Sequence, residues 1–219
     1  MKKNVIIAIG RQFGSGGHEI GNKLATKLDI PLYDRNLIRM AAEEMNISDK
    51  TVETVDETGI NKFVAYYTSP PYDYASYYSN YINNPDFAQP LSEQVYSAQT
   101  KIIKRLAERS SCVVIGRCAD YILENNPGLI SVFITADKDA RTKRIAWKYD
   151  ISERKAADRI KKIDRERKYY YETHTGRDWG VSSSYHAILN AGRLGTDQTV
   201  SYLAKLYEMK LDELNPADE

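Results

Sequence analysis

The sequence predicts a three-layer α/β/α fold in which helices cover both faces of a five-stranded parallel sheet. Short apolar runs rich in β-branched residues, typical of buried parallel strands, recur along the chain. Segments of helical periodicity separate them, as expected when helices connect parallel strands. The first run also passes through a glycine-rich turn straight into a helix. The predicted strands are residues 5–9, 30–33, 112–116, 130–134 and 186–190.

The turn after the first strand has the features of a phosphate-binding loop. Residues 14–17 read Gly-Ser-Gly-Gly, and apolar residues recur every four positions from Ile20 to Leu28 in the helix that follows. Glycines let backbone N–H groups converge, and a helix N-terminus carries about half a positive charge. An ordinary strand-to-helix turn is the alternative interpretation.

The turn departs from the P-loop pattern G-x-x-x-x-G-K-[ST] at several positions. Gly17 stands where the lysine that reaches the phosphates would be, and Arg11 stands in place of the first glycine. His18 and Glu19 follow, and Glu19 replaces the magnesium-binding hydroxyl but could hold magnesium through water. We expect His18, Arg11 or an arginine from another segment to supply the missing charge.

The remaining elements follow from periodicity and capping residues. Asp137 and Ser152 are placed to cap two successive helices, the first of which carries Arg141 and Arg144. Besides the helix at 17–28, the predicted helices lie at about 34–45, 48–61, 95–109, 137–149, 152–168 and 200–207.

One segment interrupts the α/β alternation. Seven tyrosines lie between Tyr66 and Tyr81, together with Pro70-Pro71. We expect a packed lobe or a homodimer interface there, since tyrosine is large and amphipathic. Inserted aromatics forming an acceptor pocket are the alternative.

Arginines follow the predicted strands. Arg117 comes directly after strand 112–116, and Asp34-Arg35 come after strand 30–33. These residues belong at the carboxyl edge of the sheet, where α/β folds bind ligands, and a guanidinium there suits bidentate phosphate binding.

A charged stretch lies further along the chain. Nine of the eleven residues 158–168 are charged, six of them basic. They predict either a solvated helix with pairs such as Asp158–Lys162 and Asp164–Lys168, or part of a closing lid together with Arg141 and Arg144.

These segments together resemble the cytidylate kinase-like family of P-loop proteins, relatives of the bacterial cytidylate kinases. The matching segments are residues 11–21, 31–35, 113–123 and 163–167, which occur in order along nearly the whole chain. The resemblance implies a P-loop NTPase fold with a helical acceptor-binding insertion and an arginine-bearing lid. It implies a single kinase domain over 1–219, with a core of 1–35, 95–150 and 180–219, an inserted lobe at about 36–94 and a lid at about 150–178. ATP and Mg²⁺ are the implied cofactors.

The resemblance also implies roles by position. The residues that would hold the ATP phosphates are Arg11, Gly14, Ser15, Gly16, Gly17, His18 and Glu19. Those that would contact the acceptor are Asp34, Arg35, Arg117, Asp120 and Glu166. The implied catalytic residues are His18, Arg117, Arg141, Arg165 and Arg167. Asn190, Ala191 and Gly192 would lie near adenine, and Glu19 and Asp120 would hold magnesium through water. Ile115 stands where bacterial cytidylate kinases have an aspartate, which leaves Asp120 as the substitute.

The composition limits the classes of binding partner that we expect. Lys+Arg number 31 and Asp+Glu 30, a net charge of +1, so we expect small-molecule nucleotide substrates and neither nucleic acid nor membrane as partner. Cys112 and Cys118 form neither a disulfide framework nor a zinc site. A core strand begins within a few residues of Met1, which predicts a soluble cytoplasmic protein without a signal peptide.

The expected function is ATP-dependent phosphorylation of a nucleoside monophosphate, with CMP or dCMP first. Two alternatives remain open. The acceptor could be another small phosphorylated metabolite, which the tyrosine-rich insertion favours. The protein could also be a nucleotide-binding sensor without catalysis, which Gly17 and Ile115 favour.

Overall fold

The computed structural model describes residues 3–34, 36–46 and 91–216. The chain divides into two compact units, one made of Met1–Asp34 and Ile103–Glu219 and the other of Arg35–Ile102. Arg35, the predicted helix 48–61 and the tyrosine-rich segment 66–81 lie outside the described residues. All the structural arguments below concern the first unit.

The sheet has five strands, all parallel, in the order β2-β3-β1-β4-β5. The strands are β1 (Ile6–Arg11), β2 (Leu32–Tyr33), β3 (Cys112–Ile115), β4 (Leu129–Thr135) and β5 (Ala187–Asn190). This confirms the predicted sheet, although β2 is shorter than expected. Between β3 and β4 the chain passes from one side of β1 to the other, so the carboxyl end of β1 lies at the switch point where such sheets bind ligands.

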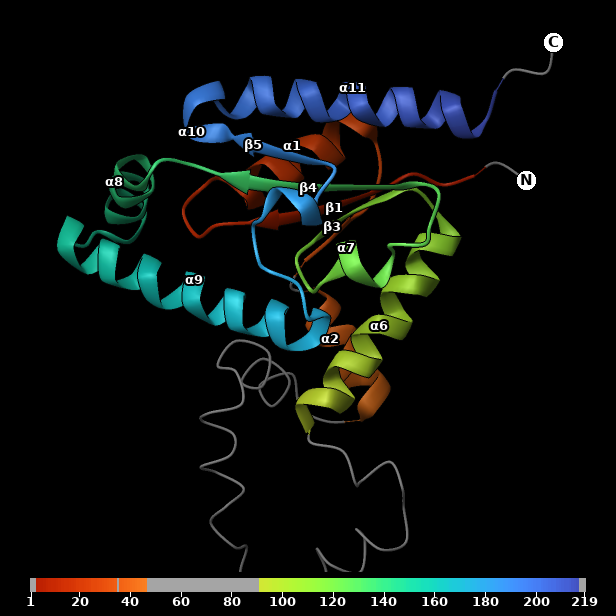
Figure 1. The fold of residues 1–219 in the computed structure, drawn as a ribbon, viewed down its shortest axis with the longest axis horizontal. Coiled ribbons are helices and arrows are strands. Elements are labelled where there is room, and N and C mark those ends of the chain that lie inside the picture. Colours follow the sequence, from red (N-terminus) through yellow and green to blue (C-terminus); the bar gives the residue numbers. More distant parts are fainter. Residues whose placement is uncertain (1–2, 35, 47–90, 217–219) are drawn as a thin grey trace, which may run out of the picture. The chain divides into compact units, whose positions relative to one another are not determined.

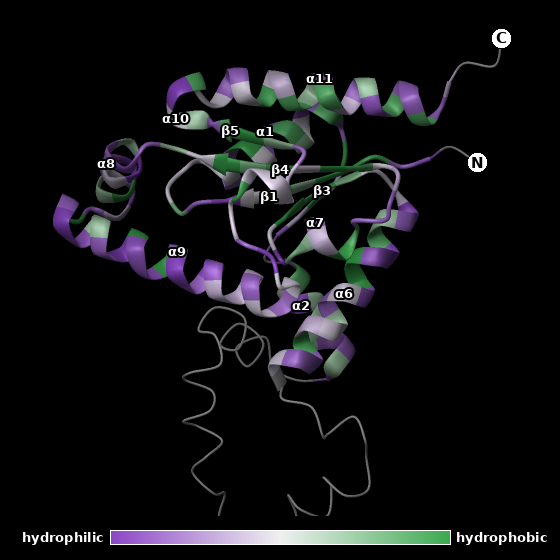
Figure 2. Cartoon of the chain, viewed as in Figure 1, coloured by the Kyte–Doolittle hydropathy of each residue, from purple (hydrophilic) through white to green (hydrophobic). Residues whose placement is uncertain are grey.

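Helices cover both faces of the sheet, as Figure 1 shows. The helices of the first unit are α1 (Gly17–Leu28), α7 (Ala119–Ile122), α8 (Lys138–Tyr149), α9 (Glu153–Thr175), α10 (Ala191–Leu194) and α11 (Thr196–Leu214), with a 3₁₀ turn at Ser182–Ser184. The second unit contains α2 (Asn36–Met45) and most of α6 (Leu91–Arg109). The strands are largely hydrophobic, whereas α9 is hydrophilic along most of its length (Figure 2). Within the described residues, none of the helices has both the length and the apolar character needed to cross a membrane.

The side chains of β1 alternate between the two faces of the sheet, and this alternation determines which of them pack against α1. Ile7 and Ile9 are buried in a cluster with Ile20 of α1 and Leu203 of α11. Each such side chain contributes about 1.5–3 kcal/mol on burial. Because successive strand residues point to opposite faces, Gly10 faces the other layer, where a Cβ would lie 2.7 Å from the Phe133 ring.

The two predicted helix caps have different outcomes. The hydroxyl of Ser152 accepts a hydrogen bond from the Lys155 N–H, which confirms a cap for α9. Asp137 occupies the N-cap position of α8 without a capping bond from its side chain. Its carboxylate instead accepts hydrogen bonds from Asn190 and Arg193, and these lower its pKa below 3.8. The cap prediction is therefore wrong for the side chain of Asp137.

Candidate functional site

A glycine loop joins β1 to the N-terminus of α1. Gly14 and Gly16 have φ angles of +81° and +90°, a region that favours glycine. The first α-helical bond is donated by the Ile20 N–H to the Gly16 carbonyl. The N–H groups of residues 17–19 therefore precede the helical ladder, where helices bind anions.

Two further helices hold this loop through its backbone. Asp164 of α9 accepts a hydrogen bond of 2.7 Å from the Phe13 N–H and one of 2.5 Å from Arg141 of α8. Arg141 also donates to the Phe13 carbonyl at 3.2 Å, and Arg167 of α9 donates to the Arg11 carbonyl at 3.1 Å. The Asp164–Arg141 pair is mostly buried, which makes its attraction strong. The loop conformation therefore depends on α8 and α9.

Arg144 of α8 lies against the loop. A Cβ at Gly16 would be 2.7 Å from an Arg144 guanidinium nitrogen. This guanidinium pairs with Glu19 at 3.1 Å, and Lys23 lies 3.8 Å from the same carboxylate. These side chains are about half exposed, so each pair contributes at most about 1 kcal/mol. Arg144 thus places a positive charge beside the first turn of α1.

The Arg11 side chain crosses from the glycine loop to the neighbouring strand ends. A Cβ at Gly17 would lie 2.7 Å from its Cβ, and a Cβ at Gly116 would lie 1.9 Å from its Nη1. Its Nη2 is 3.7 Å from a carboxylate oxygen of Asp34, whose other oxygen is 3.2 Å from His18 Nε2. The structure therefore brings together four of the predicted site residues, Arg11, Gly17, His18 and Asp34. Their roles stay predictions.

Arg117 follows β3 in an unusual turn. Gly116, Arg117 and Cys118 have φ angles of +72°, +58° and +53°, three left-handed residues in succession. The two non-glycine residues store strain of about 1–3 kcal/mol each. Strain of this kind is concentrated at functional sites. The turn is fixed by a 3.0 Å bond from the Gly116 N–H to the Ile9 carbonyl in β1. Arg117 thus lies at the carboxyl edge of the sheet, beside β1.

Asp120 does not fit its predicted acceptor and magnesium role. It is buried in α7 and accepts a 2.7 Å hydrogen bond from the Tyr171 hydroxyl of α9. Burial raises its pKa, although the bond from Tyr171 opposes this effect. Glu19, the other predicted magnesium ligand, is paired with cations. In the part of the chain that the structure describes, no three His, Cys, Asp or Glu side chains gather in a way that could hold a metal ion.

The predicted adenine residues lie at the carboxyl end of β5. The Asn190 amide donates a 3.0 Å hydrogen bond to Asp137, at the start of α8. A Cβ at Gly192 would lie 3.0 Å from that of Ala136, just after β4. Asn190, Ala191 and Gly192 therefore border the same edge of the sheet as the glycine loop.

The ion pairs made by the charged stretch of α9 differ from the predicted pairs. The observed pairs are Lys162–Glu166 at 4.0 Å and Lys168–Glu172 at 3.7 Å. Asp164 instead turns inward to the glycine loop. Arg165 is exposed, and no hydrogen bond or ion pair holds it among the described residues.

Asp164 is the site residue that the sequence interpretation missed. It continues the four-residue spacing of Ala156 and Ile160, both of which are buried. That spacing was the available signal, because it places Asp164 on the buried face of α9.

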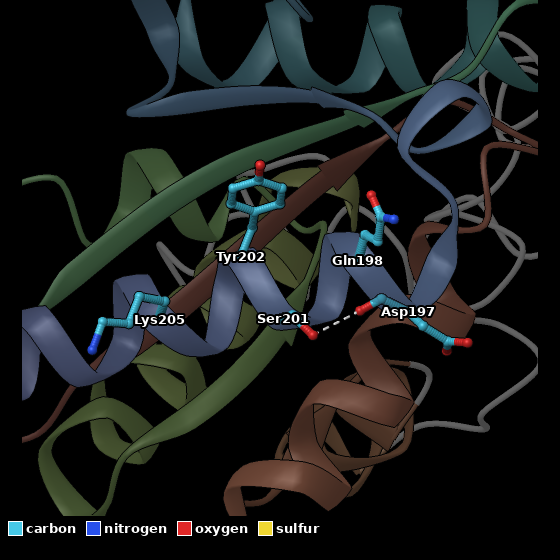
Figure 3. Close-up of a pocket in the computed structure, with 5 residues that line it drawn as sticks. All are labelled: Asp197, Gln198, Ser201, Tyr202 and Lys205. Carbon is cyan, nitrogen blue, oxygen red and sulfur yellow. Dashed lines mark hydrogen bonds between the residues drawn. The ribbon is translucent and has the colours of Figure 1, made fainter.

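A separate hollow of about 540 Å³ lies along α11. Figure 3 shows its lining residues, Asp197, Gln198, Ser201, Tyr202 and Lys205, all from that helix. None of the predicted site residues is among them, so this hollow is distinct from the glycine-loop site.

A parallel sheet of this strand order, with a glycine loop after β1 and arginines around it, defines the class of P-loop kinases. The model of the Cytidylate kinase-like family matches residues 6–193, and the chain belongs to that family. The predicted fold and family are thereby confirmed, and membership implies use of a nucleotide.

Two solved structures are similar to this chain in fold. An uncharacterized protein from Eubacterium ventriosum is 29% identical, with a TM-score of 0.67 over 94% of this chain and 99% of its own. A shikimate kinase from Bacteroides thetaiotaomicron is 17% identical, with a TM-score of 0.52 over 93% of this chain and 98% of its own, and this likeness shows the fold alone. No curated protein sequence matches the chain significantly.

Proposed function

We propose that the protein is an ATP-dependent phosphotransferase that phosphorylates a nucleoside monophosphate, with CMP or dCMP as the first candidates. The supporting observation is that Arg11 and Arg144 lie against the glycine loop at the carboxyl end of β1, while Arg117 follows the adjoining strand β3. Phosphoryl transfer requires aligned phosphates and positive charge around the transferred group more than covalent chemistry from the protein. The side chains of Arg11 and Arg144, both beside the N-terminus of α1, would supply that charge on the donor side.

The donor phosphates would lie on the glycine loop. The N–H groups of residues 17–19 would donate to phosphate oxygens, and Arg144 would neutralise charge from the side of α8. Arg141, Arg167 and Asp164 would keep the loop in its binding conformation, because they hold its backbone groups. These contacts support a positioning role for Arg141 and Arg167, and their predicted direct catalytic role stays a prediction.

Magnesium would come with the nucleotide. When bound to ATP, Mg²⁺ neutralises phosphate charge and retains several waters, and it needs only one or two protein carboxylates. The described residues do not form a protein cage for the ion, since Glu19 is paired with Arg144 and Asp120 is buried.

The acceptor phosphate would bind Arg117. This residue follows β3, next to the strand that carries the glycine loop, so it stands at the same edge of the sheet as the donor loop. Arg165, exposed on α9, is the lid arginine that would approach the nucleotide when α8 and α9 close.

One observation favours the sensor alternative. Asp34 pairs with both Arg11 and His18, which lowers the free positive charge at the loop. A sensor would bind ATP tightly and release no ADP with any acceptor.

Coupled ADP release with Mg-ATP tests the proposal across CMP, dCMP, UMP, AMP, GMP and dTMP, with the diphosphate product confirmed by mass. We expect turnover with one or two pyrimidine monophosphates. Arg117→Ala should then lower kcat/KM by about 100-fold or more. Arg154→Ala, an exposed arginine on α9, is the matched control and should match the wild type. ATP binding without ADP release from any acceptor would favour the sensor.

A further inference from the structure

We propose that the guanidinium of Arg11 takes the place of the missing P-loop lysine, and that position 17 is a glycine because the Arg11 side chain packs against it. This inference rests on the proposed phosphotransfer and names the residue that would carry its central charge. It replaces the three candidates left open by the sequence with one.

The direction of the Arg11 side chain follows from the alternation of β1. Ile7 and Ile9 face α1 and α11, and Arg11 comes next in the same series. Its side chain therefore leaves the strand toward the N-terminus of α1. In the usual P-loop pattern this position is a glycine and offers no side chain.

Steric contact at Gly17 explains why an arginine at position 11 is accompanied by a glycine at position 17. A Cβ at Gly17 would approach the Arg11 Cβ to 2.7 Å and its Cγ to 3.1 Å. Real Cβ contacts essentially never fall below 3.0 Å, and the opposing atoms lie close to the backbone, where they move least. A lysine at position 17 and an arginine at position 11 thus exclude each other. In this chain the cation stands on the strand, at position 11, and the loop has a glycine at position 17.

The far end of the side chain reaches the acceptor side of the site. The Nη1 atom occupies space beside Gly116, at the end of β3, and Nη2 faces Asp34, after β2. With the strand order β2-β3-β1, the side chain runs from the donor loop along the adjoining strand ends. Its exposed fraction is only 17%, so its charge acts in a medium of reduced dielectric constant. In the proposed reaction, a phosphoryl group would cross this location between donor and acceptor.

Four variants test the inference by turnover and by ATP affinity from isothermal titration. Arg11→Met keeps the length of the side chain and removes its charge, and should lower kcat by about 100-fold or more and weaken ATP binding. Arg11→Gly should behave alike. Gly17→Lys alone should lose activity or unfold at lower temperature through the contact with Arg11. The double variant Arg11→Gly/Gly17→Lys restores the usual pattern and should recover activity above that of Arg11→Gly.

The controls separate this inference from the proposed function. Arg154→Met, on an exposed arginine, should match the wild type in both assays, and thermal unfolding shows which variants are folded. If the wild type turns over and Arg11→Met keeps its kcat and ATP affinity within twofold, the inference is wrong while the function stands. If the wild type has no turnover but Arg11→Met, unlike Arg154→Met, weakens ATP binding tenfold, the inference stands and the function fails. Full activity of Gly17→Lys would also overturn the exclusion argument.

Discussion

The hydroxyl of Tyr171 donates a 2.7 Å hydrogen bond to Oδ2 of Asp120, and this bond joins the C-terminal half of α9 to α7. Asp120 lies just after the left-handed turn at Arg117 and Cys118. Tyr171 stacks on Tyr185, with ring centroids 6.3 Å apart and planes at 26°. A buried polar pair surrounded by aromatic rings thus anchors the turn that presents Arg117.

Asp120→Asn should change how stability depends on pH. Burial raises the pKa of Asp120 above 3.8, so the folded protein holds this proton more tightly than the unfolded chain does. The stability contributed by the group is complete below pH 3.8 and is lost as pH rises through the folded-state pKa. Asparagine lacks this titration but can still accept from Tyr171. Urea unfolding across acidic to neutral pH should show the variant gaining stability relative to wild type as pH rises. A constant difference would contradict the assignment.

Tyr171→Phe should destabilise the fold by about 1–3 kcal/mol, because it leaves the buried Asp120 carboxylate without its hydroxyl donor. Urea unfolding at neutral pH measures the change. Tyr202→Phe, on an exposed side chain of α11, is the matched control and should alter stability by less than about 0.5 kcal/mol. If the two substitutions changed the free energy of unfolding equally, the Tyr171–Asp120 bond would not stabilise the fold.

Asp164→Ala should destabilise the protein by about 3–5 kcal/mol, since it leaves the buried Arg141 guanidinium without its counter-charge. The Phe13 N–H also loses its acceptor, so ATP affinity should fall with stability. Asp158→Ala lies on the same helix at an exposed position and serves as the control. Chemical unfolding and ATP titration compare the two variants. Equal free energies of unfolding and equal ATP affinities would show that the loop keeps its conformation without Asp164.

Gly116→Ala should cost more stability than Gly176→Ala. Both glycines have similar positive φ angles, +72° and +67°. A Cβ at Gly176 has nothing within 4 Å, whereas one at Gly116 would meet Arg11 at 1.9 Å. The strain of a left-handed alanine, about 1–2 kcal/mol, is common to both, and the excess measures the contact. The melting temperatures of the two variants compare them directly, and equal losses would mean that Arg11 moves aside freely.

The parallel sheet could be predicted because each strand is a short, nearly continuous apolar run, a pattern that is specific to buried parallel strands. The edge of the sheet that carries Arg11, Arg117 and Asn190 followed from the same pattern, since these residues come at or directly after strand ends.

Where the candidate site differs from the sequence interpretation, the difference depends on backbone angles and tertiary contacts. Asp120 was expected beside Arg117, but the left-handed conformation of Arg117 and Cys118 carries α7 into the core. Nothing in the residue types predicts positive φ at an arginine and a cysteine. Asp164 looked like one member of a surface pair with Lys168, because i,i+4 spacing is local and its partners Arg141 and Phe13 are not.

The bonds from α8 and α9 to the backbone of residues 11–13 have a mechanical consequence. These helices hold the segment at the Arg11 carbonyl and at both the carbonyl and the N–H of Phe13. If the two helices moved outward together, the segment would lose these bonds and its shape. Undocking of the helices and loosening of the loop are then a single event. The hydrogen-exchange rate of the Phe13 amide would therefore report how often the helices leave the loop. A ligand that draws the helices inward would slow this exchange.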